Sequence, residues 1–196
     1  MPDASKTPPD GRLLRSERSR EAIVKATYDL VGDGILRPTA EQVAEAAGVG
    51  IRTVFRHFSD MESLFSQMNR RLRETAVPLF EAGDRDGSLE ARVCGLVRQR
   101  AALYERIAPY RRAASLSRWQ SPFLQRQESV FVREMRDDLR SWLPELADTE
   151  PTRLEAIDLA SSFEAWDRLR CQQRLGRARA RETLERTLLA LTRELG

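Results

Sequence analysis

The sequence contains few of the residues that hold metals or cross-link a fold. Its 196 residues include one histidine and two cysteines, Cys94 and Cys171, which lie far apart in the chain. Structural zinc sites and redox motifs need cysteines paired at short spacing, so we expect two reduced thiols and no metal or cofactor. A chain of this length buries roughly 70 % of its unfolded surface and needs no cross-link to fold.

Long apolar runs and enzyme signatures are also missing. No stretch of about 18 apolar residues occurs, and the first residues lack the apolar segment of a signal peptide, so we expect a cytoplasmic protein with no membrane partner. The sequence contains no P-loop, no glycine-rich dinucleotide turn and no nucleophile elbow. With one histidine, a catalytic base would be one of 30 carboxylates that the sequence does not distinguish. We therefore predict that the chain is not an enzyme.

Charge is plentiful, at 32 % of residues, but the formal net charge is only +3. That balance alone is a weak indication of a nucleic-acid partner. Lys6 and Lys25 are the only lysines, so arginine supplies nearly all of the positive charge, as is typical of GC-rich coding. Charged residues interleaved with leucine and alanine, and sparse proline and glycine, predict an all-α protein.

The amino-terminal residues 1–15 lack apolar periodicity and are predicted to form a disordered basic tail. Its arginines and those that follow either enter a DNA minor groove or have no defined role, and both interpretations stay open. From Ser16 apolar residues recur at three and four positions, which predicts a first helix ending near Gly32. The basic residues concerned are Arg12, Arg15, Arg18 and Arg20.

The next segment carries the signals of a helix-turn-helix. Thr39 with Gln42 three residues later forms a capping box pattern, and Gly48 is placed to end the short helix that follows. A further short helix is predicted over residues 51–58. Two short helices joined by a glycine-containing turn make a helix-turn-helix.

The remaining chain is predicted to be helical. A fourth helix starts from a cap at Ser59 or Asp60 and ends near Val77, and residues 81–88 form the clearest break. Later helical stretches are expected near 88–107, 109–117, 121–143, 151–175 and 178–195. We assign residues 16–77 to a DNA-binding domain with its linking helix, and residues 78–196 to a larger helical domain.

The segment TAEQVAEAAGVGIRTVFRHF, residues 39–58, followed by ESLF at 62–65, resembles the signature of the TetR family of transcriptional regulators. The resemblance covers about residues 16–70. It implies about nine helices, with a three-helix DNA-binding head and a larger ligand-binding and dimerisation domain. It also implies a homodimeric repressor that binds palindromic, double-stranded operator DNA and is released by a small-molecule effector, here unidentified.

The same resemblance assigns the helix over residues 51–58 to the major groove. Arg52 and Arg56 become the side chains that read guanine edges, although two arginines four apart also suit a solvated surface stripe. The family usually has Ser or Thr at Gly50, Tyr at Phe55 and Lys at Met61, and the last two changes remove phosphate-binding groups. The DNA-binding residues implied are Thr39, Gly50, Ile51, Arg52, Thr53, Phe55, Arg56 and His57.

Large aromatic side chains in the carboxy-terminal half are candidates for lining a ligand cavity, although most must be core. Those selected are Tyr104, Tyr110, Trp119, Phe123, Phe131, Phe163 and Trp166.

A narrow leucine stripe near the carboxyl end is predicted to meet a partner subunit, because the family pairs its last two helices as a four-helix bundle; the same stripe also suits an intramolecular core. The dimer candidates are Leu159, Phe163, Trp166, Leu184, Leu188, Leu191 and Leu195. The alternative to a ligand-released repressor is an effector-independent architectural or constitutive DNA-binding dimer.

Overall fold

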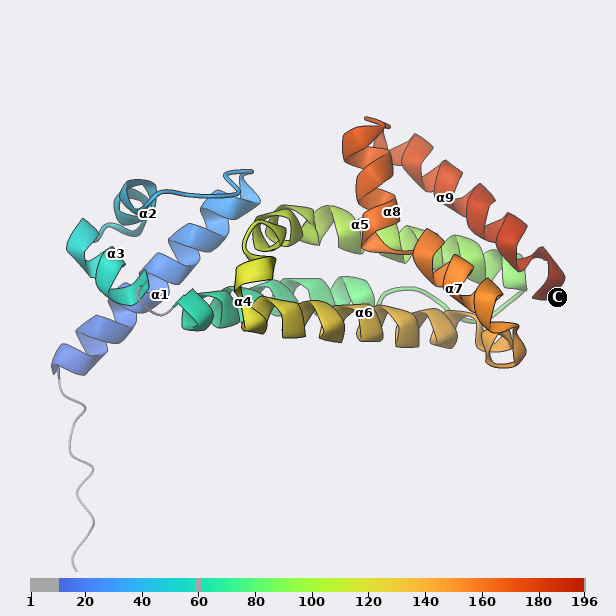
Figure 1. Ribbon diagram of the computed structural model, residues 1–196, viewed down its shortest axis with the longest axis horizontal. Coiled ribbons are helices and arrows are strands. Elements are labelled where there is room, and N and C mark those ends of the chain that lie inside the picture. The colour runs from blue at the N-terminus through green and yellow to red at the C-terminus, as the bar shows by residue number, and fades with distance from the viewer. Residues whose placement is uncertain (1–10, 59–60, 196) are drawn as a thin grey trace, which may run out of the picture.

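The computed structural model describes residues 11–58 and 61–195, and its regular structure in these ranges is entirely helical. Figure 1 shows an elongated molecule with α1, α2 and α3 at one end and the carboxy-terminal helices at the other. The predicted all-α architecture, with a helix-turn-helix head and a larger helical domain, is confirmed. Most of the predicted tail, residues 1–10, lies outside the described residues, whereas residues 11–15 belong to α1.

The head consists of α1 (Gly11–Gly32), α2 (Ala40–Ala47) and α3 (Ile51–Phe58). The predicted capping box is present: Thr39 Oγ1 accepts from the Gln42 amide at 3.2 Å, and Gln42 Oε1 accepts from the Thr39 amide at 2.9 Å. Gly48 ends α2 with φ 64°, a left-handed conformation that favours glycine. The helices of the head pack around a small core of Ile23, Ala26, Val43, Ala44 and Val54.

Two long helices continue through prolines that the sequence suggested would end them. α4 (Met61–Phe80) includes Pro78, and α5 (Leu89–Ser115) includes Pro109. A proline removes one intrahelical hydrogen bond and can bend a helix without ending it. The predicted end near Val77 is therefore wrong, while the predicted break over residues 81–88 does separate α4 from α5.

The larger domain continues with α6 (Pro122–Trp142), α7 (Pro151–Ala160), α8 (Phe163–Asp167) and α9 (Arg177–Thr192). A single helix predicted over 151–175 is interrupted after α7. Ser161 and Ser162 donate their hydroxyls to carbonyls three residues back, and the Ser162 side chain then caps α8. Serine side chains compete with the helical backbone in this way. Short turns complete the chain: η1 (Arg118–Gln120), η2 (Pro144–Asp148), η3 (Arg168–Gln172) and η4 (Arg193–Leu195).

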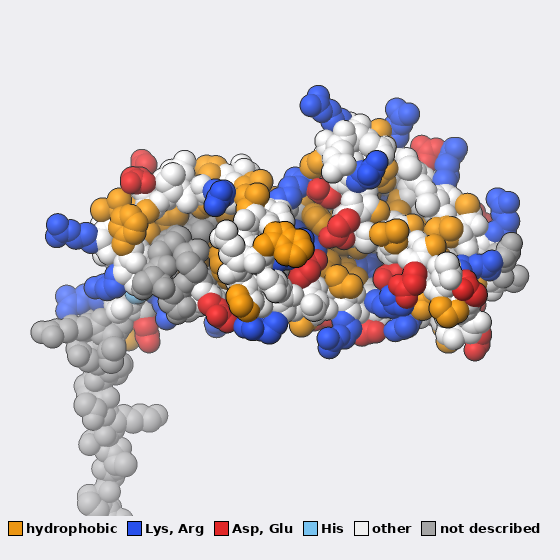
Figure 2. Space-filling model, in the orientation of Figure 1, with side chains coloured by type: hydrophobic (Ala, Val, Ile, Leu, Met, Phe, Trp, Pro, Cys, Tyr) orange, Lys and Arg blue, Asp and Glu red, His pale blue; other side chains and the backbone are white. Residues whose placement is uncertain are grey.

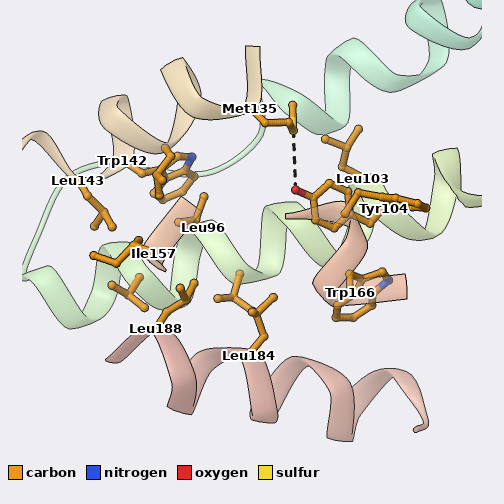
Figure 3. Packing of buried hydrophobic residues seen from close by; sticks show 14 of the residues in the cluster. Leu96, Leu103, Tyr104, Met135, Trp142, Leu143, Ile157, Trp166, Leu184 and Leu188 are labelled. Atoms are coloured by element: carbon orange, nitrogen blue, oxygen red, sulfur yellow. Dashed lines mark hydrogen bonds between the residues drawn. The ribbon is translucent and has the colours of Figure 1, made fainter. Parts of the chain in front are cut away.

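The core of the larger domain lies where α5 is covered by α6, α7, α8 and α9 (Figure 3). Trp142 fills it from α6 and reaches Gly95, where an added Cβ would lie 2.5 Å from the indole. Only glycine permits this approach of α5 to the ring. From α9, Leu184 and Leu188 point toward α5 in the same cluster, so α9 is part of the subunit core.

A buried ion pair links α5 to α6 inside this core. The side chains of Arg100 and Asp138 are each 1 % exposed and lie 3.0 Å apart, and Arg85 donates to the other carboxylate oxygen at 2.9 Å. Arg100 also donates to the Met135 carbonyl at 2.6 Å. Buried charges need such partners, because an unpaired ion in an apolar interior is strongly disfavoured.

Candidate nucleic-acid interface and ligand cavity

The helix α3 follows the Gly48 turn directly and presents one face to solvent. Val54 is fully buried beneath the helix, whereas Arg52 and Arg56 are exposed and Phe55 is 60 % exposed. In Figure 2 Lys and Arg side chains are spread over the whole visible face, and several of them lie at the head end of the molecule. A short helix with two exposed guanidinium groups on its outer face has the geometry needed to enter a major groove.

The other positions implied by the resemblance surround this face. Thr39 uses its hydroxyl oxygen to cap α2, and Ile51 is partly exposed at the start of α3. Gly50 accepts from the Thr53 amide at 2.8 Å, and a Cβ added at Gly50 would meet no described atom within 4 Å. The serine or threonine usual at this position would therefore fit without rearrangement.

His57 is less accessible than the neighbouring arginines. Its side chain is half-buried, and Nε2 is enclosed with no hydrogen-bond partner in the described ranges. Burial, followed by the nearby charges of Arg56 and Arg20, lowers the imidazole pKa below its ordinary value of 6.5. The imidazole is therefore neutral at pH 7, and a phosphate contact would have to come from Nδ1 or follow a rotation of the ring.

A cavity of about 560 Å³ lies between the head and the larger domain. Its walls come from α1, the α1–α2 connection, α4, α5 and α6. Proteins bind small molecules in cavities of roughly 300–1,000 Å³ with apolar walls and a few polar groups, and this one has that character. Head residues contribute directly to the wall: Thr27, Val31, Leu36, Arg37 and Pro38.

Three of the seven predicted cavity residues line it, namely Tyr110, Phe123 and Phe131. The other four lie outside this cavity. Tyr104, Phe163 and Trp166 are buried in the core of the larger domain, where the Tyr104 hydroxyl donates to the Ser161 carbonyl at 2.8 Å. Trp119 lies on η1 with 81 % of its surface exposed.

Most of the wall residues were not among those predicted from the sequence. Leu64, Phe65, Met68 and Leu72 of α4 read as an ordinary apolar helix face, and α1 reads as head core. Nothing in their spacing distinguishes a side chain that faces a cavity from one that faces a packed neighbour.

Polar pairs bridge the cavity walls. Asn69 of α4 donates to Gln127 of α6 at 2.7 Å. Arg73 of α4 and Glu134 of α6 form two hydrogen bonds, at 2.7 and 3.0 Å. On the other side, Glu128 accepts from Arg111 at 2.7 Å, and its second oxygen lies 3.0 Å from Arg118.

The predicted dimer stripe is mostly used inside the subunit. Leu184, Leu188, Phe163 and Trp166 are buried in the core, so they are not available to a partner; of the two uses predicted for the leucine stripe, the structure shows the intramolecular one. Leu191 and Leu195 are partly buried against the same cluster. Leu159 is the exception, because 70 % of its surface is exposed on α7.

Two further features are absent from the described part of the chain. No group of three or more His, Cys, Asp or Glu side chains is arranged to hold a metal ion. No helix there is long and apolar enough to cross a bilayer.

Comparison with known proteins identifies the head. Residues 23–68 match the family model of bacterial regulatory proteins of the tetR family, and this range contains α2, α3 and the connection into α4. The fold of the whole chain resembles that of a tetR-family transcriptional regulator from Streptomyces coelicolor, with a TM-score of 0.67 at 21 % identity over 91 % of this chain and 82 % of that one. Residues 23–68 thus carry the DNA-binding head typical of the tetR family, and the rest of the chain resembles these regulators in fold.

Two other solved structures have a similar fold. A transcriptional regulator from Rhodococcus sp. Rha1 has a TM-score of 0.65 at 18 % identity, covering 91 % of this chain and 96 % of its own. The multidrug binding protein EbrR, solved with imidazole, has a TM-score of 0.58 at 18 % identity, covering 95 % and 96 %. No curated protein sequence gives a significant match to this chain. The chain therefore has the fold of a DNA-binding transcriptional regulator.

Proposed function

We propose that this TetR-family protein is a cytoplasmic homodimeric repressor, without enzymatic activity, that binds a palindromic operator through α3 and is released by a small molecule in the cavity. Residues 16–77 would act as the DNA-binding unit and residues 78–196 as the ligand-binding and dimerisation unit. The observation that carries the proposal is the exposed position of Arg52 and Arg56 on α3, directly after the helix-turn-helix turn.

Arginine is the side chain best suited to this task. Its guanidinium bonds the O6 and N7 of guanine together, and each such pair is worth about 1–3 kcal/mol of discrimination. In a twofold dimer the two α3 helices would enter major grooves one turn apart, roughly 34–36 Å, over a palindromic site. Thr39, Gly50, Ile51, Thr53, Phe55 and His57 would lie against the groove or its phosphates.

The outer faces of α7 and α9 are the proposed dimer surface. Leu159 exposes most of an apolar side chain on α7, and α7 packs directly against α9. Burying such a side chain against a partner is worth about 1.5–3 kcal/mol. The buried leucines of α9 are therefore no longer candidates for the dimer contact, and the proposed surface consists of residues that a second subunit can reach.

The cavity supports release by an effector, because the head supplies part of its wall. A ligand that fits one orientation of the head better than another shifts the balance between them. Couplings of this kind are typically 1–3 kcal/mol, which corresponds to about 5–150-fold in operator affinity. A domain that served only dimerisation would not need a cavity of this size between the head and the larger domain.

The experiment compares Arg52→Ala with Arg98→Ala, a control that removes an exposed arginine of α5 outside the cavity. Operators are first selected from a random duplex pool with the unaltered protein. Arg52→Ala should lose about 1–3 kcal/mol of affinity and relax preference at one base position, while Arg98→Ala binds like the parent protein. An unchanged sequence preference in Arg52→Ala would refute α3 as the reading helix.

A further inference from the structure

We infer that the cavity selects a lipophilic monoanion. Its apolar body would lie between α4, α5 and α6, and its carboxylate would be held by Arg111 and Arg118. The inference rests on the proposed function only in assigning the cavity to an effector. It names a chemical class that follows from how the charges around the cavity are paired.

Two of the three carboxylates that line the cavity, Glu128 and Glu134, are paired with arginines, and the third, Glu81, is exposed to solvent. Both oxygens of Glu134 accept from Arg73, so this pair is neutral and offers little to a cationic ligand. Glu128 is shared between two arginines, one on each carboxylate oxygen, at 2.7 and 3.0 Å. Within the cavity wall, Arg111, Arg118 and Glu128 therefore carry an excess of one positive charge. Glu164 also contacts Arg111, but it lies outside the wall and is 61 % exposed, so it offsets this charge only weakly.

Arg111 is the central member of this cluster. Its side chain is only 12 % exposed, and its guanidinium carbon lies 3.9 Å from the centre of the Phe131 ring and 4.7 Å from that of Phe163. A second carboxylate, on the largely exposed Glu164, lies 3.3 Å from the same nitrogen that Glu128 accepts from. The guanidinium is thus held in place by two aromatic rings and by hydrogen bonds from one nitrogen to two carboxylates.

One donor of Arg111 remains unused. Its Nε is buried and has no hydrogen-bond partner in the described ranges. A buried donor without an acceptor is disfavoured, and such groups in native proteins call for an explanation. An anionic oxygen beside Arg111 would satisfy this donor and neutralise the excess charge in one step.

The rest of the cavity matches an apolar body. Its wall residues from α4, α5 and α6 are mainly aliphatic and aromatic, and its polar side chains Asn69 and Gln127 already bond each other. Phe131 lies between the two parts, because it lines the cavity and stacks on Arg111. An amphipathic acid would place its hydrocarbon chain against the apolar wall and its carboxylate beside Arg111 and Arg118. The apolar wall includes Leu64, Phe65, Met68, Leu72, Leu103 and Ile107.

The test uses three ligands of equal length and different charge: decanoate, 1-decanol and decylammonium. Binding to the full chain is measured by isothermal titration calorimetry below the aggregation limit of each ligand, without DNA. Decanoate should bind at least about tenfold more tightly than the other two, because a charge-assisted hydrogen bond to a guanidinium is roughly twice as strong as a neutral one. Equal affinities, tighter decylammonium binding or no binding of decanoate would each overturn the inference.

Two variants locate the anion site. Arg118→Gln lies on a partly exposed turn and should weaken decanoate binding several-fold without unfolding the protein. Glu128→Gln removes the carboxylate that competes with the ligand and should strengthen decanoate binding; a cation site would instead be weakened. Arg98→Gln is the matched control and should leave all affinities unchanged. Thermal unfolding of each variant confirms that it is folded, and a loss of affinity in Glu128→Gln would refute the anion assignment.

The outcomes separate this inference from the proposed function. Operator binding by the unliganded protein, tested with Arg52→Ala, does not depend on the ligand class. If the operator is bound and decylammonium is the preferred ligand, the regulator proposal stands and the anion class fails. If decanoate binds but does not lower operator affinity, the site is real and release by this ligand class fails.

Discussion

Tyr28 of the head and Tyr110 of the larger domain stack with ring centroids 4.3 Å apart and an interplanar angle of 24°. Tyr28 lies on α1 and its hydroxyl is 3.3 Å from that of Thr75 on α4, while Tyr110 lies on α5 and lines the cavity. Burial and then contact with Tyr28 raise the Tyr110 pKa, so the phenol stays neutral at any ordinary pH. The pair is thus an uncharged contact between the head and the cavity wall.

Gly32 makes room for this contact. A Cβ added there would lie 2.7 Å from the Tyr110 hydroxyl, so Gly32→Ala should displace the ring and cost about 1–3 kcal/mol of stability, as overpacking does. We expect a lower urea midpoint and a changed operator affinity.

The control for this prediction is Tyr110→Phe, which removes the hydroxyl and keeps the ring. In the Tyr110→Phe protein, Gly32→Ala should change the stability little, since the next ring atom lies 3.6 Å from the added Cβ. An equal cost in both backgrounds would show that the alanine acts elsewhere than on Tyr110.

Leu159→Glu should convert the proposed dimer to monomers. The side chain is mostly exposed in the subunit, so a carboxylate there leaves the fold intact but would be buried unpaired in the proposed interface. Light scattering after size exclusion measures the mass. Val132→Glu, at another exposed apolar position on α6, is the control and should stay dimeric. If Leu159→Glu still forms dimers, the interface lies elsewhere on the subunit.

Asp138→Asn should destabilise the larger domain by about 3–5 kcal/mol, because it leaves the buried Arg100 without its counter-charge. Urea unfolding gives the value. Asp137→Asn is the adjacent control: that carboxylate is exposed and lies 3.6 Å from Arg140, so its loss should cost less than about 1 kcal/mol. Similar costs for both would show that the buried pair contributes no more than a surface pair.

His57 should make the protein less stable in mild acid. Because the folded state lowers the His57 pKa, the unfolded chain binds the proton more readily below pH 6.5, and stability falls as the pH drops through this range. The urea midpoint of the parent protein should fall more between pH 7.5 and 5.5 than that of His57→Gln. An equal change in both proteins would mean that the imidazole is not desolvated.

The sequence predicted the head well because its signals are local. The Thr39 capping box and the Gly48 turn need only neighbouring residues, and the structure contains both. The leucine stripe of α9 was ambiguous, since the same periodicity serves a partner helix or the subunit's own core, and Leu184 and Leu188 turned inward.

The cavity and the buried ion pair were beyond sequence reasoning. Arg100 and Asp138 read as two of many surface charges, because nothing local indicates that α5 and α6 enclose them. The aromatic residues chosen as cavity candidates divide according to their helix face: Tyr110 and Phe131 meet the cavity, whereas Tyr104 points into the core.

The residues of α1 and the α1–α2 connection form part of the cavity wall. Operator binding by the head should therefore also affect how tightly the cavity holds a small molecule. Whatever factor a bound molecule imposes on operator affinity, the operator must impose on the affinity for that molecule. If the small molecule weakens operator binding, DNA-bound protein would have the lower affinity for it. Free protein would then bind the small molecule first. Under the proposed release, the effector concentration needed to free the operator would accordingly rise with the amount of unbound protein in the cell.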